Sequence, residues 1–184
     1  MTDAEADVQT MEDYTGYYNS YFYQFWVQFA SAQAWDGQSC SEIACCIDWL
    51  ARYISPDFAS NINKIYISNY AQGLYDLFWA AGRVGTAPQI GAFVWFDYGD
   101  GNGLSHTGRV MRFDASNVHT FEGNVGGLTV QRDYPINSPY IAYYGYPNYD
   151  NIPIPTPTPT PTPPPVGGKH FAQYYRHPKR VRRN

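Results

Sequence analysis

The sequence predicts an α+β domain in which helices come first and an antiparallel β-sheet follows. Before Gly91, apolar residues recur at three- and four-residue intervals, as on one face of a helix. After Gly91, β-rich runs alternate with clusters of Gly, Asn and Asp, as in hairpins. The chain has 184 residues, enough for one domain that buries a real core and for an appendage.

Three helices are expected in the first half of the chain. Aromatic residues at helical spacing predict the first over roughly 13–32. Periodic Ile and Ala residues predict the second over about 40–54, ended by Pro56. The third is expected from about 69 to 81, with leucines and a phenylalanine facing inward.

Five short runs rich in β-branched and aromatic residues follow, and each predicts a strand. They cover residues 92–96, 107–113, 118–121, 128–131 and 140–144. Helices grouped ahead of such strands indicate helices packed on an antiparallel sheet in a domain of about 150 residues.

Charge and composition divide the chain into four parts. Residues 1–12 form an acidic N-terminal extension, and residues 13–150 form the main domain. Residues 151–165 are an alternating Thr-Pro linker, expected to be a stiff polyproline II spacer of roughly 40 Å. Residues 166–184 carry six basic residues and no acidic one. This tail could dock on an anionic polymer such as teichoic acid or nucleic acid; a solubilising tail or the stub of a further domain is the alternative.

The cysteines and the N-terminus bear on the compartment. Three cysteines clustered at Cys40, Cys45 and Cys46 make a poor disulfide framework and lack a metal-ligand spacing, so reduced thiols in a reducing compartment are expected. The acidic start lacks the basic and apolar regions of a signal peptide, and no apolar run reaches membrane-spanning length. The sequence therefore predicts a protein of the cytoplasm that has no membrane partner.

Cys40 is the candidate nucleophile among the three thiols. It falls in the first turn of the second predicted helix, with Ser39 or Gln38 near the cap position. Unpaired N–H groups and the helix dipole at that end lower the pKa of a thiol. Cys45 and Cys46 fall inside the helix, where a cysteine usually acts as a small buried apolar residue, and Cys40 could have that inert role too.

His106 is the candidate base, because it opens a predicted strand from which a side chain can reach a helix N-terminus packed on the sheet. Glu122, at the end of the next strand, could orient the imidazole, and Asn124 is a candidate supporting polar residue. The alternatives are a structural histidine, a strand-end carboxylate and a turn asparagine. His119 is expected to occupy an exposed strand position.

At these residues the chain resembles the CHAP domains, the cysteine, histidine-dependent amidohydrolases/peptidases. The Cys40-Ser41-Glu42 start of the helix resembles their nucleophile helix, His106-Thr107-Gly108 their His-Val-Gly strand, and Glu122-Gly123-Asn124 their Glu-Gly-Asn element. The segments 87–96 and 144–147 also resemble that family, so the likeness runs in order over about residues 14–149. The chain departs from the pattern at Ser39, where the family has an aromatic residue, and at Ala92, where it has Asp.

The resemblance implies a papain-like α+β fold and hydrolysis of a peptidoglycan amide bond. It makes Cys40 the nucleophile, His106 the base, Glu122 its orienter and Asn124 a supporting residue, with Gln38 a candidate second donor to the oxyanion. No cofactor and no metal are expected, because the oxygen-rich loop at Asp97, Asp100 and Asn102 lacks the spacing of an EF-hand.

With the linker and the basic tail, the likeness points to a monomeric phage or prophage endolysin that waits in the host cytoplasm and acts on peptidoglycan. Two alternatives remain open. One is a related cell-wall endopeptidase, although its Asp-Cys-Ser-Gly signature is absent around Cys40. The other is a non-catalytic protein with a degenerate cysteine-hydrolase fold that binds wall or nucleic acid through its tail.

Overall fold

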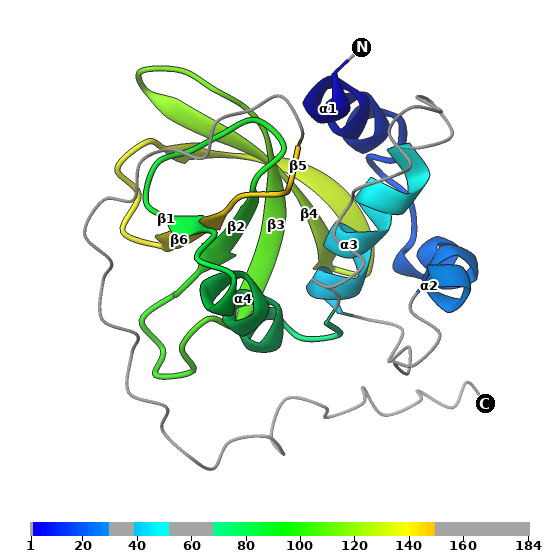
Figure 1. Ribbon diagram of the computed structural model, residues 1–184, viewed down its shortest axis with the longest axis horizontal. Helices are drawn as coiled ribbons and strands as arrows, with labels where there is room; N and C mark the ends of the chain where they lie inside the picture. Colours follow the sequence, from blue (N-terminus) through cyan, green and yellow to red (C-terminus); the bar gives the residue numbers. More distant parts are fainter. Residues whose placement is uncertain (1, 30–38, 52–67, 150–184) are drawn as a thin grey trace, which may run out of the picture.

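The computed structural model describes residues 2–29, 39–51 and 68–149. Helices α1 (Asp3–Asp13), α2 (Tyr23–Phe29) and α3 (Cys40–Ala51) lie on one side of a six-stranded sheet, with α3 against the strands (Figure 1). Helix α4 (Ala71–Ala80) packs near the opposite end of the sheet, where Phe78 contacts Phe93 and Trp95 of β2. The predicted α+β fold, with N-terminal helices packed on a C-terminal sheet, is confirmed.

Every strand of the sheet pairs antiparallel with its neighbours, in the order β1-β6-β2-β3-β4-β5. The central strand β3 therefore lies between β2 and β4. In sequence order the strands are β1 (Val84–Gly85), β2 (Phe93–Phe96), β3 (His106–Phe113), β4 (Asn117–Val125), β5 (Leu128–Pro135) and β6 (Ile141–Gly145).

Each face of the sheet carries its own apolar core. Side chains alternate between the faces along a strand, so Phe93 and Trp95 face the helices while Val94 and Phe96 face away from them. The helix-side core includes Trp26, Ile43 and Phe121, all completely buried. Two cores allow β2, β3 and β4 to be buried on both faces, which holds their side chains rigidly.

The predicted helix over residues 13–32 is wrong over its first part. Helix α1 ends at Asp13, Gly16 adopts a left-handed backbone (φ 86°), and a single 3₁₀ turn, η1 (Asn19–Phe22), leads into α2. Tyr18 is extended because it pairs with β5, where it forms a bridge with Leu128. Tertiary pairing overrides the helical spacing of the aromatic residues, which cluster across the turn instead.

The first helix is part of the folded body, although the sequence placed residues 1–12 in an extension. Thr2 and Glu5 form a reciprocal capping box that begins α1. Asp7 is completely buried, and α1 packs along α3. One acidic residue of this segment, Asp7, therefore belongs to the core and not to the surface.

The other predicted elements agree with the structure to within a few residues. Helix α3 covers the predicted 40–54 segment as far as Ala51, beyond which the segment lies outside the described residues, and α4 covers the third predicted helix. The two-residue strand β1 was not predicted, because it is too short to carry a periodic pattern. The linker and the basic tail lie outside the described residues. No helix within the described ranges is long and apolar enough to span a bilayer.

Candidate active site

Cys40 is the first residue of α3, and Ser39 caps the helix. The Ser39 hydroxyl accepts hydrogen bonds from the N–H groups of Ser41 (3.1 Å) and Glu42 (3.5 Å). The Cys40 N–H stands at the first helical position, where no intrahelical partner exists. The small polar residue that departs from the CHAP pattern thus has a local role, since it begins the helix that presents the thiol.

His106 is the first residue of β3, and its ring is held by neighbours on β2 and β4. The ring packs beside Phe96, with 5.5 Å between centroids, and beside Tyr98 at 6.4 Å. Its Nε2 lies 2.9 Å from Oε2 of Glu122. Burial raises the pKa of Glu122, but hydrogen bonds from His106 and other neighbours outweigh burial and lower it overall. An ionised carboxylate can only accept, so Nε2 carries the proton and Nδ1 is left for the sulfur.

The thiol and the imidazole each shift the other's pKa in the direction that favours an ion pair. Burial raises the pKa of Cys40, but the charge and hydrogen bond of His106, with backbone N–H groups of Thr107 and Ser41, lower it overall. Burial lowers the pKa of His106, yet the Cys40 thiolate and Glu122 raise it to about 10. A thiolate beside an imidazolium is the activated form of a cysteine nucleophile.

Glu122 is fully buried and has further partners that the sequence did not indicate. Thr120 donates its hydroxyl to Oε1 at 2.7 Å, and the Arg132 guanidinium lies 3.6 Å from Oε2. Tyr134 also hydrogen-bonds the carboxylate. Strand alternation could have found Thr120, two residues before Glu122, and hairpin register could have found Arg132 opposite Thr120. These groups keep the carboxylate ionised and fix its direction toward the imidazole.

Two glycines of the motifs permit close approach of the elements that carry the site. A Cβ at Gly108 would lie 2.6 Å from the Phe121 carbonyl oxygen and 2.8 Å from Cγ of Glu122. A Cβ at Gly123 would lie 2.6 Å from Cβ of Ile43 in α3. Glycine is therefore required on β3 for the approach of Glu122, and on β4 for the approach of the nucleophile helix.

A buried arginine joins the nucleophile helix to the strand of the base. Arg109, three residues after His106, bonds Asp48 (2.7 Å) and the Ala44 carbonyl (3.1 Å) of α3. It also pairs with Asp7 of α1. Its guanidinium lies 4.2 Å from the Phe93 ring centroid and bonds the Gly91 carbonyl and the Tyr149 hydroxyl. The corresponding position of the CHAP pattern is apolar, so no sequence signal indicated this cluster.

The structure brings Cys40, His106 and Glu122 together, whereas Asn124 bonds to a different segment and Gln38 is outside the described part. Asn124 (φ 59°) pairs with Asn19 through two hydrogen bonds of 3.0 and 3.2 Å, so it anchors the η1 turn. Gln38 lies outside the described residues. His119 pairs with Asp133 at 2.6 Å, away from the thiol.

Neither the other two cysteines nor the acidic loop after β2 shows the features of a reactive site. Burial raises the pKa of Cys45 to about 12 and that of Cys46 well above its usual range, which makes both poor nucleophiles. Asp97 and Asp100 accept hydrogen bonds from the backbone N–H groups two residues on, as in hairpin loops. Among the described residues, no group of three or more His, Cys, Asp or Glu side chains could hold a metal ion.

The comparisons with known proteins reach only distant structures. No family model and no curated protein matches the chain. Among solved structures, the chain is similar to Ly7917 with the hydrolyzing product of MDP, at 17% identity and a TM-score of 0.46, over 77% of this chain and 61% of that one. A second structure of Ly7917 gives 22% identity and a TM-score of 0.39, over 66% and 60% of the two chains. The chain thus spans about three fifths of those proteins, and a likeness this distant does not carry their ligand or activity to it.

Proposed function

We propose that the chain is a cysteine hydrolase that cleaves an amide bond of bacterial cell-wall peptide by a Cys-His-Glu mechanism. The observation that carries this proposal is the thiol of Cys40 at a helix N-terminus, whose pKa the neighbouring His106 lowers, together with the 2.9 Å contact between Nε2 of His106 and a buried carboxylate. A structural cysteine would need neither the imidazole nor the carboxylate. The ordered likeness to CHAP motifs supports peptidoglycan as the substrate.

In the proposed reaction the Cys40 thiolate attacks the carbonyl carbon of the amide. The Cys40 N–H at the start of α3 donates to the oxyanion of the tetrahedral intermediate. The imidazolium of His106 then protonates the leaving amine, which leaves an acyl-enzyme thioester. Neutral His106 next takes a proton from water, which attacks the thioester and releases the acid and the thiol. Glu122 holds the Nε2–H throughout, so that Nδ1 always faces the sulfur.

The proposal extends to the setting of a phage endolysin. Such a protein would collect in the host cytoplasm as a monomer and act on the wall once the membrane is opened. The Thr-Pro linker and basic tail support this setting, because a tethered cationic segment raises the local concentration of a catalytic domain at an anionic wall. If a chain ending at Asp150 cleared cells as well as the full chain at every salt concentration, the tail would have no such role.

The decisive experiment measures clearing of purified peptidoglycan by four proteins. The wild type and a Cys45→Ser/Cys46→Ser double variant should clear it, whereas Cys40→Ala should not. Glu122→Gln should retain binding and lose rate by about 100-fold or more, because the imidazole loses its orienting charge. Undiminished clearing by Cys40→Ala would remove the nucleophile. Inactivity of all four would favour a non-catalytic binding protein. Mass spectrometry of the fragments would separate a muramoyl–alanine amidase from an endopeptidase.

A further inference from the structure

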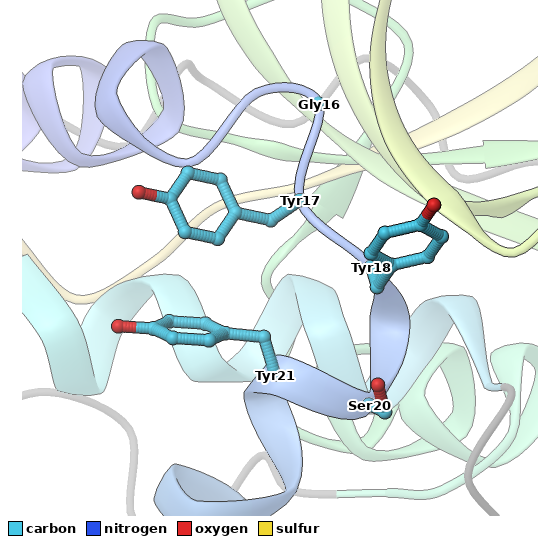
Figure 2. Close-up of a pocket in the computed structure, with 5 residues that line it drawn as sticks. All are labelled: Gly16, Tyr17, Tyr18, Ser20 and Tyr21. Carbon is cyan, nitrogen blue, oxygen red and sulfur yellow. The ribbon is translucent and has the colours of Figure 1, made fainter.

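Residues 16–21, between α1 and α2, form an open pocket of about 400 Å³ lined by Gly16, Tyr17, Tyr18, Ser20 and Tyr21 (Figure 2). We call it the tyrosine pocket. Tyr17 and Tyr21 are about 40% exposed, and Tyr18 is 72% exposed. Tyr17 and Tyr21 lie side by side, and Tyr18 projects to the other side of the segment (Figure 2). Exposed aromatic rings commonly mark a surface that contacts a ligand.

The backbone that displays these rings is held firmly on the sheet. The Gly16 N–H donates to the Thr129 carbonyl at 2.9 Å, and the Asn19 N–H donates to the Gly127 carbonyl at 3.0 Å. Tyr17 exchanges hydrogen bonds with Thr129 through its backbone N–H and carbonyl. The segment is therefore tied to β5 by backbone hydrogen bonds and one bridge, so its exposed side chains stand on a firmly held backbone.

The rings also hold one another in place. Tyr17 lies 5.2 Å from Tyr14 and 4.9 Å from Tyr21, and Tyr21 lies 5.6 Å from Phe25, measured between ring centroids. A ring fixed by its neighbours loses little further conformational freedom when a ligand binds. Tyr17 and Tyr21 are therefore preorganised, while Tyr18 is held through its backbone bridge to Leu128.

The lining indicates the chemistry of the ligand. It offers flat aromatic faces, phenol hydroxyls and the Ser20 hydroxyl, and it contains no group charged at neutral pH. Acidic residues outnumber basic ones in the described part of the chain, which disfavours nucleic acid or an anionic membrane at this surface. An uncharged sugar ring, with an apolar C–H face and a rim of hydroxyls, matches aromatic faces edged with hydroxyls.

The tyrosine pocket is connected to the candidate active site. Asn19, within the segment that lines it, holds Asn124 by two hydrogen bonds. Asn124 follows Glu122 by two residues, so their Cα atoms lie within about 7 Å of each other. Between them, Gly123 packs directly on Ile43 of the nucleophile helix. The pocket segment and Glu122 are thus linked through the same end of β4.

We propose that the tyrosine pocket binds an uncharged glycan chain, as a second subsite linked to the candidate active site through β4. This inference rests on the proposed function only for the identity of the natural ligand, which would be the glycan strand that carries the wall peptide. Engagement of the glycan would bring its attached peptide to Cys40 and would lower KM without changing the chemical step.

The test measures binding of the soluble, uncharged tetramer of N-acetylglucosamine to the full chain by calorimetry. Tyr18→Ser should weaken binding about tenfold, because it removes a ring face worth about 1.4 kcal/mol. Tyr70→Ser, a change at a tyrosine that is 44% exposed just before α4, should leave binding within about twofold. Cys40→Ala should bind the tetramer as the wild type does, since the sugar does not need the thiol.

A second measurement compares hydrolysis of peptidoglycan with hydrolysis of a sugar-free wall peptide. Tyr18→Ser should raise KM on the first substrate alone. If Tyr18→Ser loses tetramer binding while no protein hydrolyses either substrate, the glycan inference stands and the proposed function fails. If the tetramer binds wild type and Tyr18→Ser equally, or binds neither, the inference is overturned. Dependence of self-association or vesicle binding on Tyr18, without tetramer binding, would likewise overturn it.

Discussion

Replacement of Arg109 by Met should be among the most destabilising single changes in the described part of the chain. The side chain is completely buried and pairs with Asp7 and Asp48 from two different helices. Met keeps much of the volume and the contact with Phe93 but leaves two buried carboxylates without their cation. Breaking a buried ion pair from one side costs about 3–5 kcal/mol.

In a domain of this size 1 kcal/mol shifts Tm by about 2–4 °C, so the expected loss is roughly 6–20 °C. The assay is thermal and urea unfolding followed by circular dichroism. Arg112→Met is the matched control: Arg112 is on the same strand but exposed, and its loss should cost less than about 0.5 kcal/mol. Adding Asp7→Asn and Asp48→Asn to Arg109→Met should recover part of the loss, because the unpaired charges disappear.

The change in the stability of Arg109→Met with pH provides an independent test of the same cluster. Burial raises the pKa of Asp7 well above its usual value even though the Arg109 charge lowers it. Without Arg109 that pKa rises further, so the folded state binds a proton that the unfolded state releases at neutral pH. Stability of Arg109→Met should therefore fall as pH rises from about 5 to 7. A cost below about 1 kcal/mol, or a deficit that grows on acidification, would refute this account of the cluster.

Two further predictions concern the site itself. Iodoacetamide should alkylate Cys40 at neutral pH and leave Cys45 unmodified. The alkylation rate of Cys40 should fall as pH drops through its lowered pKa. In His106→Ala the imidazole no longer opposes the effect of burial on the thiol, so the pKa of Cys40 should rise above the ordinary thiol value and the alkylation rate should fall at a correspondingly higher pH. Equal alkylation of both cysteines in the folded protein would contradict the ion pair. Gly123→Ala should cost about 1–3 kcal/mol in urea unfolding, and Ile43→Ala in the same chain should relieve the clash. Additive costs of the two changes would show that the contact is not tight.

The sequence predicted the fold well because its residue pattern changes at Gly91. Helix-spaced apolar residues before Gly91 and runs of β-branched and aromatic residues after it are local signals, and α3 and the central strands lie where these signals placed them. The aromatic run before α2 misled the prediction, because its backbone hydrogen bonds go to Thr129 and Gly127, more than 100 residues away. Single-chain periodicity carries no information about such a partner.

Some residues of the candidate site could be identified from local sequence signals, and others could not. Cys40, His106 and Glu122 could be selected because each begins or ends an element, where side chains from different elements meet. Asn124 was expected beside them, but its left-handed backbone and the register shift of β4 direct it to Asn19. Arg109 carried no signal at all, since a charged residue within an apolar strand identifies its partners only after the fold is known.

The pairing of residues 16–19 with β5 also bears on solubility. An open sheet has two edge strands, and an unprotected edge can recruit the edge of another molecule. Here the β1 edge is only two residues long, and the start of β5 is covered by the chain's own segment at Leu128. Farther along, Arg132, Asp133 and Pro135 occupy the same strand, and charge and proline discourage further strand addition. The segment that displays the tyrosines therefore also shields the sheet from growing into a fibril.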